Sequence, residues 1–256
     1  MAEVKTARLL ERSALSEHTA LLRFAADGAF IFTGGQYVIV NTLVPVGPPS
    51  EGKTVKRAYS VLSSDADHGT FEIAVRRIDQ GPGSNYMLAL ELGARLEFSG
   101  PWGKYLPTTA IEGEDDATLF LATDTGITVA LGLLRGAAFR TRLQRARLVW
   151  IAESDDYFVS EEFVRERLPQ DCISFERILV PMDKEARATW LARKQQSLLD
   201  MALRDKPRAA YLSGDGSLLA AFRDALRGLE TDAPTIFVES FFHHQDLKTV
   251  ATRVSQ

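Results

Sequence analysis

The chain has 256 residues, 45% of them apolar and 25% charged, which predicts a globular protein of two packed domains. Its net charge of −4 does not favour nucleic acid or an anionic membrane as a partner. No apolar run approaches the roughly 20 residues of a membrane-spanning helix, and residues 1–10 lack the apolar segment of a secretory signal.

Cys172 is the only cysteine, so we expect neither a disulfide nor a thiolate cluster, and we place this cysteine in the interior of a strand. A cytoplasmic protein that is not inserted in a membrane is expected.

The first hundred residues are typical of an antiparallel β domain. Short runs rich in β-branched and aromatic residues occur at 20–24, 36–40, 59–62 and 70–76. Turn sequences rich in glycine, proline and aspartate separate them. Several short strands at this spacing predict a small barrel or sandwich. We assign residues 1–110 to this domain and expect a β-barrel.

After residue 107 the pattern changes to alternating strands and helices. An acidic stretch at 112–116 is a candidate linker. Apolar runs predict strands at 117–122, 147–152, 175–180, 208–212 and 235–238. Helical patterns lie between them at 127–139, 160–168, 190–203 and 218–229. The alternation predicts a Rossmann-like, doubly wound parallel sheet over residues 111–256, with helices on both faces.

Three short segments are candidates for a functional site, and the first two contain groups suited to bind a phosphate or a flat heterocycle. The first is Arg57-Ala58-Tyr59-Ser60, where a strand would place a phosphate-binding guanidinium and an aromatic ring on one face. The second, residues 81–86, has a glycine-rich turn before a predicted helix that Ser84 would cap. The third, residues 99–105, is a corner rich in glycine and proline. Taken alone, each segment is better explained as an ordinary strand or turn.

In this order, and across a β domain followed by an α/β domain, the three segments resemble the ferredoxin–NADP⁺ reductase superfamily over essentially the whole chain. The family's Arg-x-Tyr-Ser motif is similar to residues 57–60, its Gly-x-x-Ser motif to residues 81–84, and its Gly-Pro-Phe-Gly corner to residues 100–103. The resemblance implies that the β-barrel binds a flavin, with FAD favoured over FMN.

The resemblance also implies roles for individual residues. Arg57 would bind the flavin pyrophosphate, Tyr59 would pack on the isoalloxazine ring, and Ser60 would hydrogen-bond near the flavin N5. The other implied flavin contacts are Ala58, Ala74, Val75, Arg76, Gly81, Gly83, Ser84 and Asn85.

The second domain departs from the family pattern in its dinucleotide turn. Thr125 and Gly126 are the implied nucleotide contacts, but Asp124 replaces the first glycine of Gly-Thr-Gly-Ile-Ala/Thr-Pro and Val129 replaces the proline. A carboxylate at this position opposes a pyrophosphate. It could instead cap the helix that follows. We expect nicotinamide binding to be weakened or altered.

Three further features of this domain bear on hydride transfer. Ser213 replaces the cysteine of the family's Cys-Gly-x-Pro motif, and Glu239 is similar to the glutamate of its terminal strand, so the implied catalytic residues are Ser60, Ser213 and Glu239. Phe241 or Phe242 could shield the flavin. Residues 153–157 are acidic and would repel the 2′-phosphate of NADPH, which favours NADH, although a solvated acidic loop explains them equally well.

Together these features predict an FAD-dependent oxidoreductase that passes electrons between NADH and a protein or small acceptor such as ferredoxin. No metal site is expected in the chain itself. Two alternatives stay open. One is a flavoprotein with weakened or lost nicotinamide binding, reduced by ferredoxin or flavodoxin or acting as a flavin-bearing subunit. The other is a non-catalytic interaction module that binds no flavin.

Overall fold

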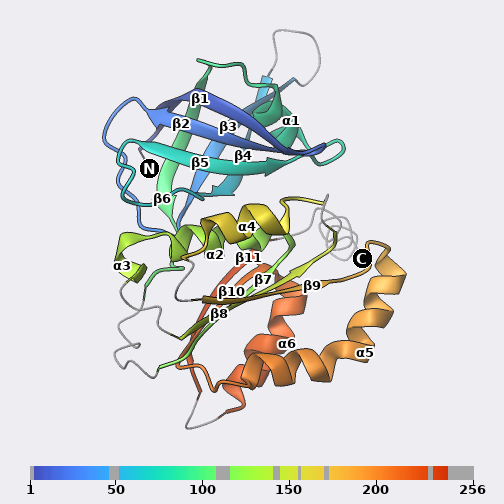
Figure 1. Ribbon diagram of the computed structural model, residues 1–256. Coiled ribbons are helices and arrows are strands. Elements are labelled where there is room, and N and C mark those ends of the chain that lie inside the picture. Colours follow the sequence, from blue (N-terminus) through green and yellow to red (C-terminus); the bar gives the residue numbers. More distant parts are fainter. Residues whose placement is uncertain are drawn as a thin grey trace, which may run out of the picture.

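The computed structural model describes residues 3–45, 52–107, 116–140, 145–154, 157–169, 173–229 and 233–241. Figure 1 shows an antiparallel sheet formed by the first hundred residues and a parallel sheet with helices on both faces formed by the rest. The predicted fold class, a β domain followed by a Rossmann-like α/β domain, is confirmed. Within these ranges no helix is long and apolar enough to cross a bilayer. Several residues named above lie outside the described ranges: Asp155 and Asp156 of the acidic loop, Cys172, and Phe242.

The antiparallel sheet has six strands in the order β4-β3-β6-β1-β2-β5. These are β1 (Lys5–Ser16), β2 (Thr19–Ala26), β3 (Tyr37–Pro45), β4 (Gly52–Ser60), β5 (Thr70–Arg76) and β6 (Arg95–Trp102). Just after β4, the Leu62 N–H donates to the Glu72 carbonyl of β5 at 2.9 Å. The chain that follows one edge strand thus reaches the opposite edge, which gives the sheet a barrel-like curvature.

Alternating residues of the strands build the core of this domain. Along β5, Phe71, Ile73 and Val75 are buried, and the residues between them are only partly buried. The rings of Phe30 and Phe98 meet edge-on with their centroids 5.1 Å apart. Because neighbouring residues of a strand point to opposite sides, the second face of β5 is turned toward the other domain.

The parallel sheet has the strand order β11-β10-β7-β8-β9. Its strands are β7 (Thr118–Thr123), β8 (Ala146–Ala152), β9 (Ile173–Leu179), β10 (Ala209–Asp215) and β11 (Thr235–Phe241). Every residue of β7 is buried, as expected for a central strand covered on both faces. The chain winds outward from β7 to β9 and then returns to the other side of β7. The winding direction therefore reverses between β7 and β10, and ligands commonly bind at the carboxyl ends of such strands.

Helices cover both faces of the parallel sheet. They are the 3-10 helix η1 (Asp124–Gly126), α2 (Ile127–Leu134), α3 (Ala137–Arg140), α4 (Glu161–Arg167), α5 (Lys184–Leu203) and α6 (Gly216–Arg227). In Figure 1, α2 and α4 lie between the two domains, and α5 and α6 cover the far face of the sheet. The single helix predicted over 127–139 is interrupted, because Arg135 ends α2 and α3 begins after Gly136, a poor helix former.

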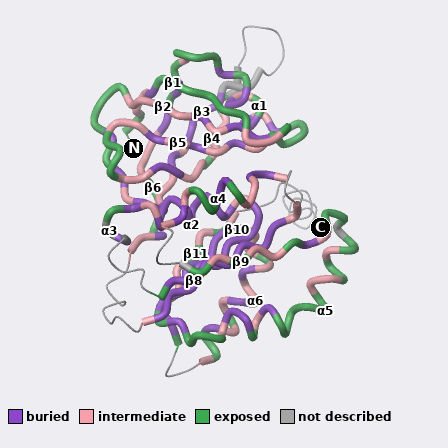
Figure 2. Tube along the Cα trace, viewed as in Figure 1, coloured by how far each residue is buried: buried purple, intermediate pink, exposed green. Residues whose placement is uncertain are grey.

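The two domains pack closely where α2 meets the β domain. All of α2 is buried (Figure 2). A Cβ atom on Gly132 would overlap the Val61 carbonyl oxygen, and one on Gly34 would overlap the Gly132 carbonyl oxygen. At the end of α2, Arg135 Nη1 donates to the Leu62 carbonyl at 3.0 Å. The predicted division at residue 110 falls within residues 108–115, outside the described ranges, so it stays a prediction.

Candidate functional site

The first group of candidate residues lies where the end of β4 meets the start of α1 (Pro82–Ala89). Arg57 and Tyr59 are partly buried on one face of β4, whereas Ala58 is exposed on the other. A Cβ atom on Gly83 would lie 2.5 Å from Arg57 Cγ and 3.3 Å from the Tyr59 hydroxyl oxygen. Burial raises the pKa of Tyr59, so the ring stays neutral. Glycine at position 83 therefore allows α1 to approach the arginine and the tyrosine closely.

The N-terminus of α1 presents backbone N–H groups to this cluster. Its N-cap residue is Gly81, and no described side chain caps the helix. The prediction that Ser84 caps it is wrong: the Ser84 hydroxyl donates to the Gly81 carbonyl at 3.1 Å and accepts from the Ile78 N–H at 3.0 Å, which fixes the preceding turn. The N–H groups of Gly83 and Ser84, together with Arg57, form a place suited to phosphate.

The residues at the end of β5, the strand that leads to this turn, contact both domains. Val75 is buried in the core of the β domain, so only its backbone is available to a ligand outside that core. Ala74 packs against the core of the second domain. Arg76 crosses between the domains: its Nε donates to the Tyr157 carbonyl at 3.0 Å, and its guanidinium lies 3.7 Å from the centre of the Tyr157 ring. Burial raises the pKa of Tyr157 to about 12. Arg76 thus joins the predicted flavin strand to the loop after β8.

The three predicted catalytic residues come from three strands near the domain boundary. Ser60 ends β4 and pairs with Tyr37 of β3. Ser213 of β10 pairs with Glu239 of β11. Burial raises the pKa of Tyr37, and the nearby charge of Glu239 raises it further. The charge of Glu239 thus acts on Tyr37, the residue that pairs with Ser60.

Ser213 is fully buried and its hydroxyl is already engaged. It donates to the Gly126 carbonyl at 2.9 Å. A Cβ atom on Gly126 would overlap the Ser213 carbonyl, so this position requires glycine. The buried hydroxyl of Tyr105 lies beside Ser213, and burial raises its pKa. In this conformation Ser213 fixes the turn before α2, and a nicotinamide could reach it only after a rearrangement.

Asp124 opens this turn in a left-handed conformation. Its φ is +46°, which glycine adopts freely and aspartate tolerates at a small cost. The Trp150 Nε1–H donates to its carbonyl at 2.9 Å. Asp124 is the first residue of η1, with Thr123 as the N-cap of η1 and Gly126 as the N-cap of α2. Thr125, partly buried, accepts a bond at its carbonyl from the Thr128 hydroxyl at 2.9 Å.

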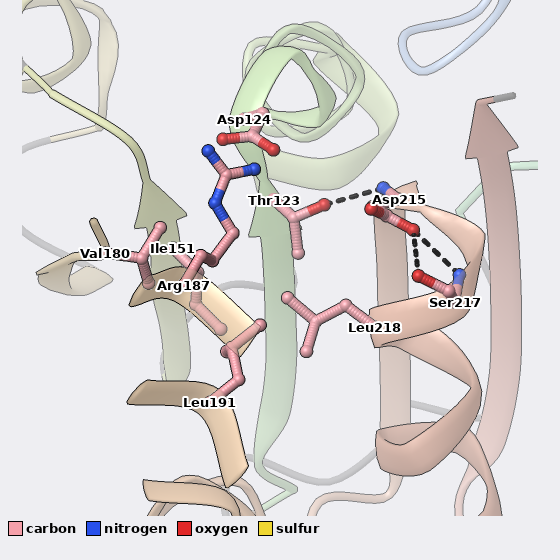
Figure 3. A pocket seen from close by; sticks show the side chains of 9 residues that line it. All are labelled: Thr123, Asp124, Ile151, Val180, Arg187, Leu191, Asp215, Ser217 and Leu218. Carbon is pink, nitrogen blue, oxygen red and sulfur yellow. Dashed lines mark hydrogen bonds between the residues drawn. The ribbon is translucent and has the colours of Figure 1, made fainter. Parts of the chain in front are cut away.

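A pocket of about 210 Å³ opens beside this turn, at the carboxyl ends of the central strands (Figure 3). Its lining consists of Thr123, Asp124, Ile151, Val180, Arg187, Leu191, Asp215, Ser217 and Leu218. Asp215 caps α6 and accepts bonds from the Ser217 N–H at 2.8 Å and the Ser217 hydroxyl at 2.6 Å. Arg187 enters from α5 and is ion-paired with Glu153, the residue after β8. The pocket lies at the reversal point of the sheet, where doubly wound folds bind nucleotides.

Sequence reasoning gave no role to four residues of this region: Tyr37, Tyr105, Tyr157 and Arg187. They come from elements far apart in the chain. Tyr105 and Tyr157 end the segments 99–105 and 153–157, in which neither tyrosine received a role of its own. Asp183 accepts a bond from the Ala186 N–H at 2.8 Å and caps α5, so an N-cap pattern would have extended the helix predicted over 190–203 to include Arg187.

Comparison with known proteins finds an FAD-binding family and several named reductases that are similar to this chain. Residues 6–106 match the family model described as the oxidoreductase FAD-binding domain. The chain is 39% identical over 152 residues to ferredoxin–NADP reductase B of Sorangium cellulosum, an alignment that covers 59% of this chain and 57% of the relative. It is 35% identical over 135 residues to NADH-cytochrome b5 reductase 1 of Mycosarcoma maydis, with 51% of this chain and 38% of the relative covered. The matches thus span little more than half of the first relative's length and less of the second's.

Solved structures share the two-domain fold. The cytochrome P450 reductase GcoB of Amycolatopsis superposes with a TM-score of 0.70 at 19% identity, over 93% of this chain and 70% of that one. The ferredoxin–NADP⁺ reductase of Plasmodium falciparum gives a TM-score of 0.68 at 17% identity, over 92% and 95%. The chain therefore shares the two-domain fold of these reductases, and its residues 6–106 match an oxidoreductase FAD-binding domain.

Proposed function

We propose that the chain is an FAD-dependent oxidoreductase that passes electrons between a nicotinamide dinucleotide and an electron-carrier protein such as ferredoxin. The observation that carries the proposal is the contact of Arg57 and Tyr59 with the N-terminus of α1, inside a domain that matches the FAD-binding family. These groups fit the cofactor, because a guanidinium and backbone N–H groups suit a pyrophosphate and an aromatic ring suits a flat heterocycle. Bound FAD would supply the hydride and one-electron chemistry.

Different residues of β4 and α1 would bind the pyrophosphate and the ring of this cofactor. Arg57 and the N–H groups of Gly83 and Ser84 would hold the pyrophosphate, a diphosphate grip that favours FAD over FMN. Tyr59 would pack on the ring and Ser60 would hydrogen-bond near its N5. The flanking positions proposed to border the flavin are Ala58, Ala74, Val75, Arg76, Gly81 and Asn85.

The pocket at the reversal point of the parallel sheet is the proposed nicotinamide dinucleotide site. Thr125 and Gly126 form the turn beside it, and Ser213 and Glu239 lie on the neighbouring strands. Glu153 follows β8, the second strand of the domain, where an acidic residue can accept bonds from a free ribose diol and repel a 2′-phosphate. We therefore favour NADH over NADPH.

The proposed partner is an electron-carrier protein, in line with the relatives that are named as ferredoxin and cytochrome b5 reductases. The single cysteine of the chain suits a reducing compartment, which supports a cytoplasmic location.

The test is anaerobic rapid mixing of the FAD-loaded protein with NADH and, separately, with NADPH, while the flavin absorbance is followed. We expect NADH to bleach the flavin band rapidly and NADPH to do so more slowly. Faster bleaching by NADPH would overturn the cofactor preference. A flavin that dithionite bleaches but neither nucleotide reduces would show that the nicotinamide part of the proposal is wrong.

Asp124 favours a second candidate function. Its carboxylate stands beside the pocket where the family has glycine, so the chain could be a flavoprotein without nicotinamide turnover that is reduced by ferredoxin or flavodoxin. Bleaching by reduced ferredoxin, in a preparation that neither nucleotide reduces, would support this candidate. Bleaching by NADH at a comparable rate would contradict it.

A further inference from the structure

The nucleotide pocket has a charge balance that opposes phosphate. Two carboxylates, those of Asp124 and Asp215, belong to its lining, and a third, that of Glu153, is ion-paired with Arg187. Within the described ranges, Arg187 is the one cationic residue in the lining. Phosphate groups entering the pocket would meet more negative than positive charge, and the repulsion grows where water is excluded.

Among these acidic residues, Asp124 has an unusual backbone conformation and is almost fully buried. It stands at the carboxyl end of β7 with a left-handed φ of +46°, and only 9% of the residue is exposed. In Figure 3 the Asp124 carboxylate and the Arg187 guanidinium point toward one another across the pocket. The side chain therefore occupies the place where a glycine would leave room for a ligand.

Arg187 is held against the wall of the pocket by several partners. Its Nη2 pairs with Glu153 and also donates to the Met182 carbonyl at 3.3 Å. Its Nε donates to the Pro181 carbonyl at 3.0 Å. The ion pair with Glu153 offsets the positive charge of Arg187, and the Asp124 carboxylate that faces the guanidinium in Figure 3 adds a second negative charge beside it.

We propose that Asp124 is a specificity-determining residue that opposes phosphate binding in this pocket and engages Arg187 as its counter-ion. Removing the carboxylate then frees the arginine to bind a dinucleotide phosphate. The inference rests on the proposed function, because it takes the pocket to be the nucleotide site. The inference also predicts different effects on charged and uncharged ligands. The affinity for NAD⁺, which carries a pyrophosphate, should depend on Asp124, whereas the affinity for adenosine, which carries no phosphate, should not.

The experiment is calorimetric titration of the FAD-loaded protein with NAD⁺ and with adenosine. Asp124→Asn removes the charge and keeps the size, and Asp124→Gly also removes the side chain and relaxes the left-handed backbone. Asp200→Asn is the matched control, since it removes an equal charge from α5 at roughly 20 Å from Arg187, thirteen residues along the helix. Flavin absorbance verifies that each variant is folded.

We expect both Asp124 variants to bind NAD⁺ about tenfold or more tightly than the wild type, because removing a like charge near contact is worth at least this much. Adenosine binding should be unchanged in all variants, and so should NAD⁺ binding by Asp200→Asn. Adding Arg187→Met to Asp124→Asn should abolish the gain.

Two outcomes would overturn the inference and leave the proposed function standing: unchanged NAD⁺ affinity in variants of a wild type that binds it, or an equal gain for adenosine. If NAD⁺ binds neither the wild type nor any variant, the nicotinamide part of the proposed function fails as well.

Discussion

Replacing Gly83 with alanine should separate flavin binding from folding. Gly83 does not adopt a left-handed φ, and alanine in a helix is favoured over glycine by up to about 1 kcal/mol. The new Cβ atom would lie 2.5 Å from Arg57 Cγ, whereas ordinary contact begins at 3.4 Å. The arginine must therefore shift by roughly 1 Å, which moves its guanidinium away from the N-terminus of α1.

The size of the effect follows from the interaction that is lost. A hydrogen bond to a charged group contributes about 1.5–3 kcal/mol, so the Kd for FAD should rise about 10- to 100-fold. The free energy of unfolding of the apoprotein should change by less than about 1 kcal/mol. Quenching of FAD fluorescence measures the first quantity, and urea unfolding measures the second.

Gly28→Ala is the control for this substitution, because a Cβ atom there would meet no atom within 4 Å. We expect it to bind FAD as the wild type does. Unchanged FAD affinity in Gly83→Ala, together with unchanged affinity in Arg57→Ala, would refute the role assigned to Arg57.

Three further predictions concern the domain contact, the nucleotide turn and the terminal strand. Gly132→Ala should lower the free energy of unfolding by about 1–3 kcal/mol, because its Cβ atom would overlap the Val61 carbonyl; wild-type stability in urea would contradict the close packing of the domains. Trp150→Phe removes the 2.9 Å bond to the Asp124 carbonyl and should cost about 1–2 kcal/mol in the same assay; no measurable cost would show that this bond does not stabilise the turn. Burial raises the pKa of Glu239 in the folded state, so its ionisation destabilises the fold as the pH rises through that pKa. The Glu239→Gln substitution should therefore raise the free energy of unfolding more at about pH 7 than at about pH 4. Equal changes at both pH values in chemical unfolding would argue against the burial of Glu239.

The parallel sheet was easier to predict than the antiparallel one. Strands such as β7 are buried throughout and read as continuous apolar runs. β1 was not predicted, because most of its residues are exposed or only partly buried and the alternation of apolar side chains is weak. The same holds for β6, of which only two residues are buried.

In the candidate site, features set by the local sequence could be predicted, and contacts set by domain packing could not. Arg57 and Tyr59 could be placed on one face because a strand alternates with a period of two. The cap assigned to Ser84 was wrong because the helix begins earlier, with Gly81 as its N-cap, so that Ser84 is its third residue. The contact of Arg76 with Tyr157 depends on how the two domains pack, and no local pattern predicts such a contact.

We propose that the chain moves electrons from a nicotinamide dinucleotide through bound FAD to a one-electron acceptor. The most direct measurement is NADH oxidation coupled to the reduction of ferredoxin or cytochrome c, with the FAD-loaded protein compared with the apoprotein under the same conditions. We predict turnover by the FAD-loaded protein, loss of turnover without FAD, and a marked decrease in Arg57→Ala at FAD concentrations below its raised Kd. An FAD-loaded protein that oxidises neither NADH nor NADPH in the presence of these acceptors would contradict the claim.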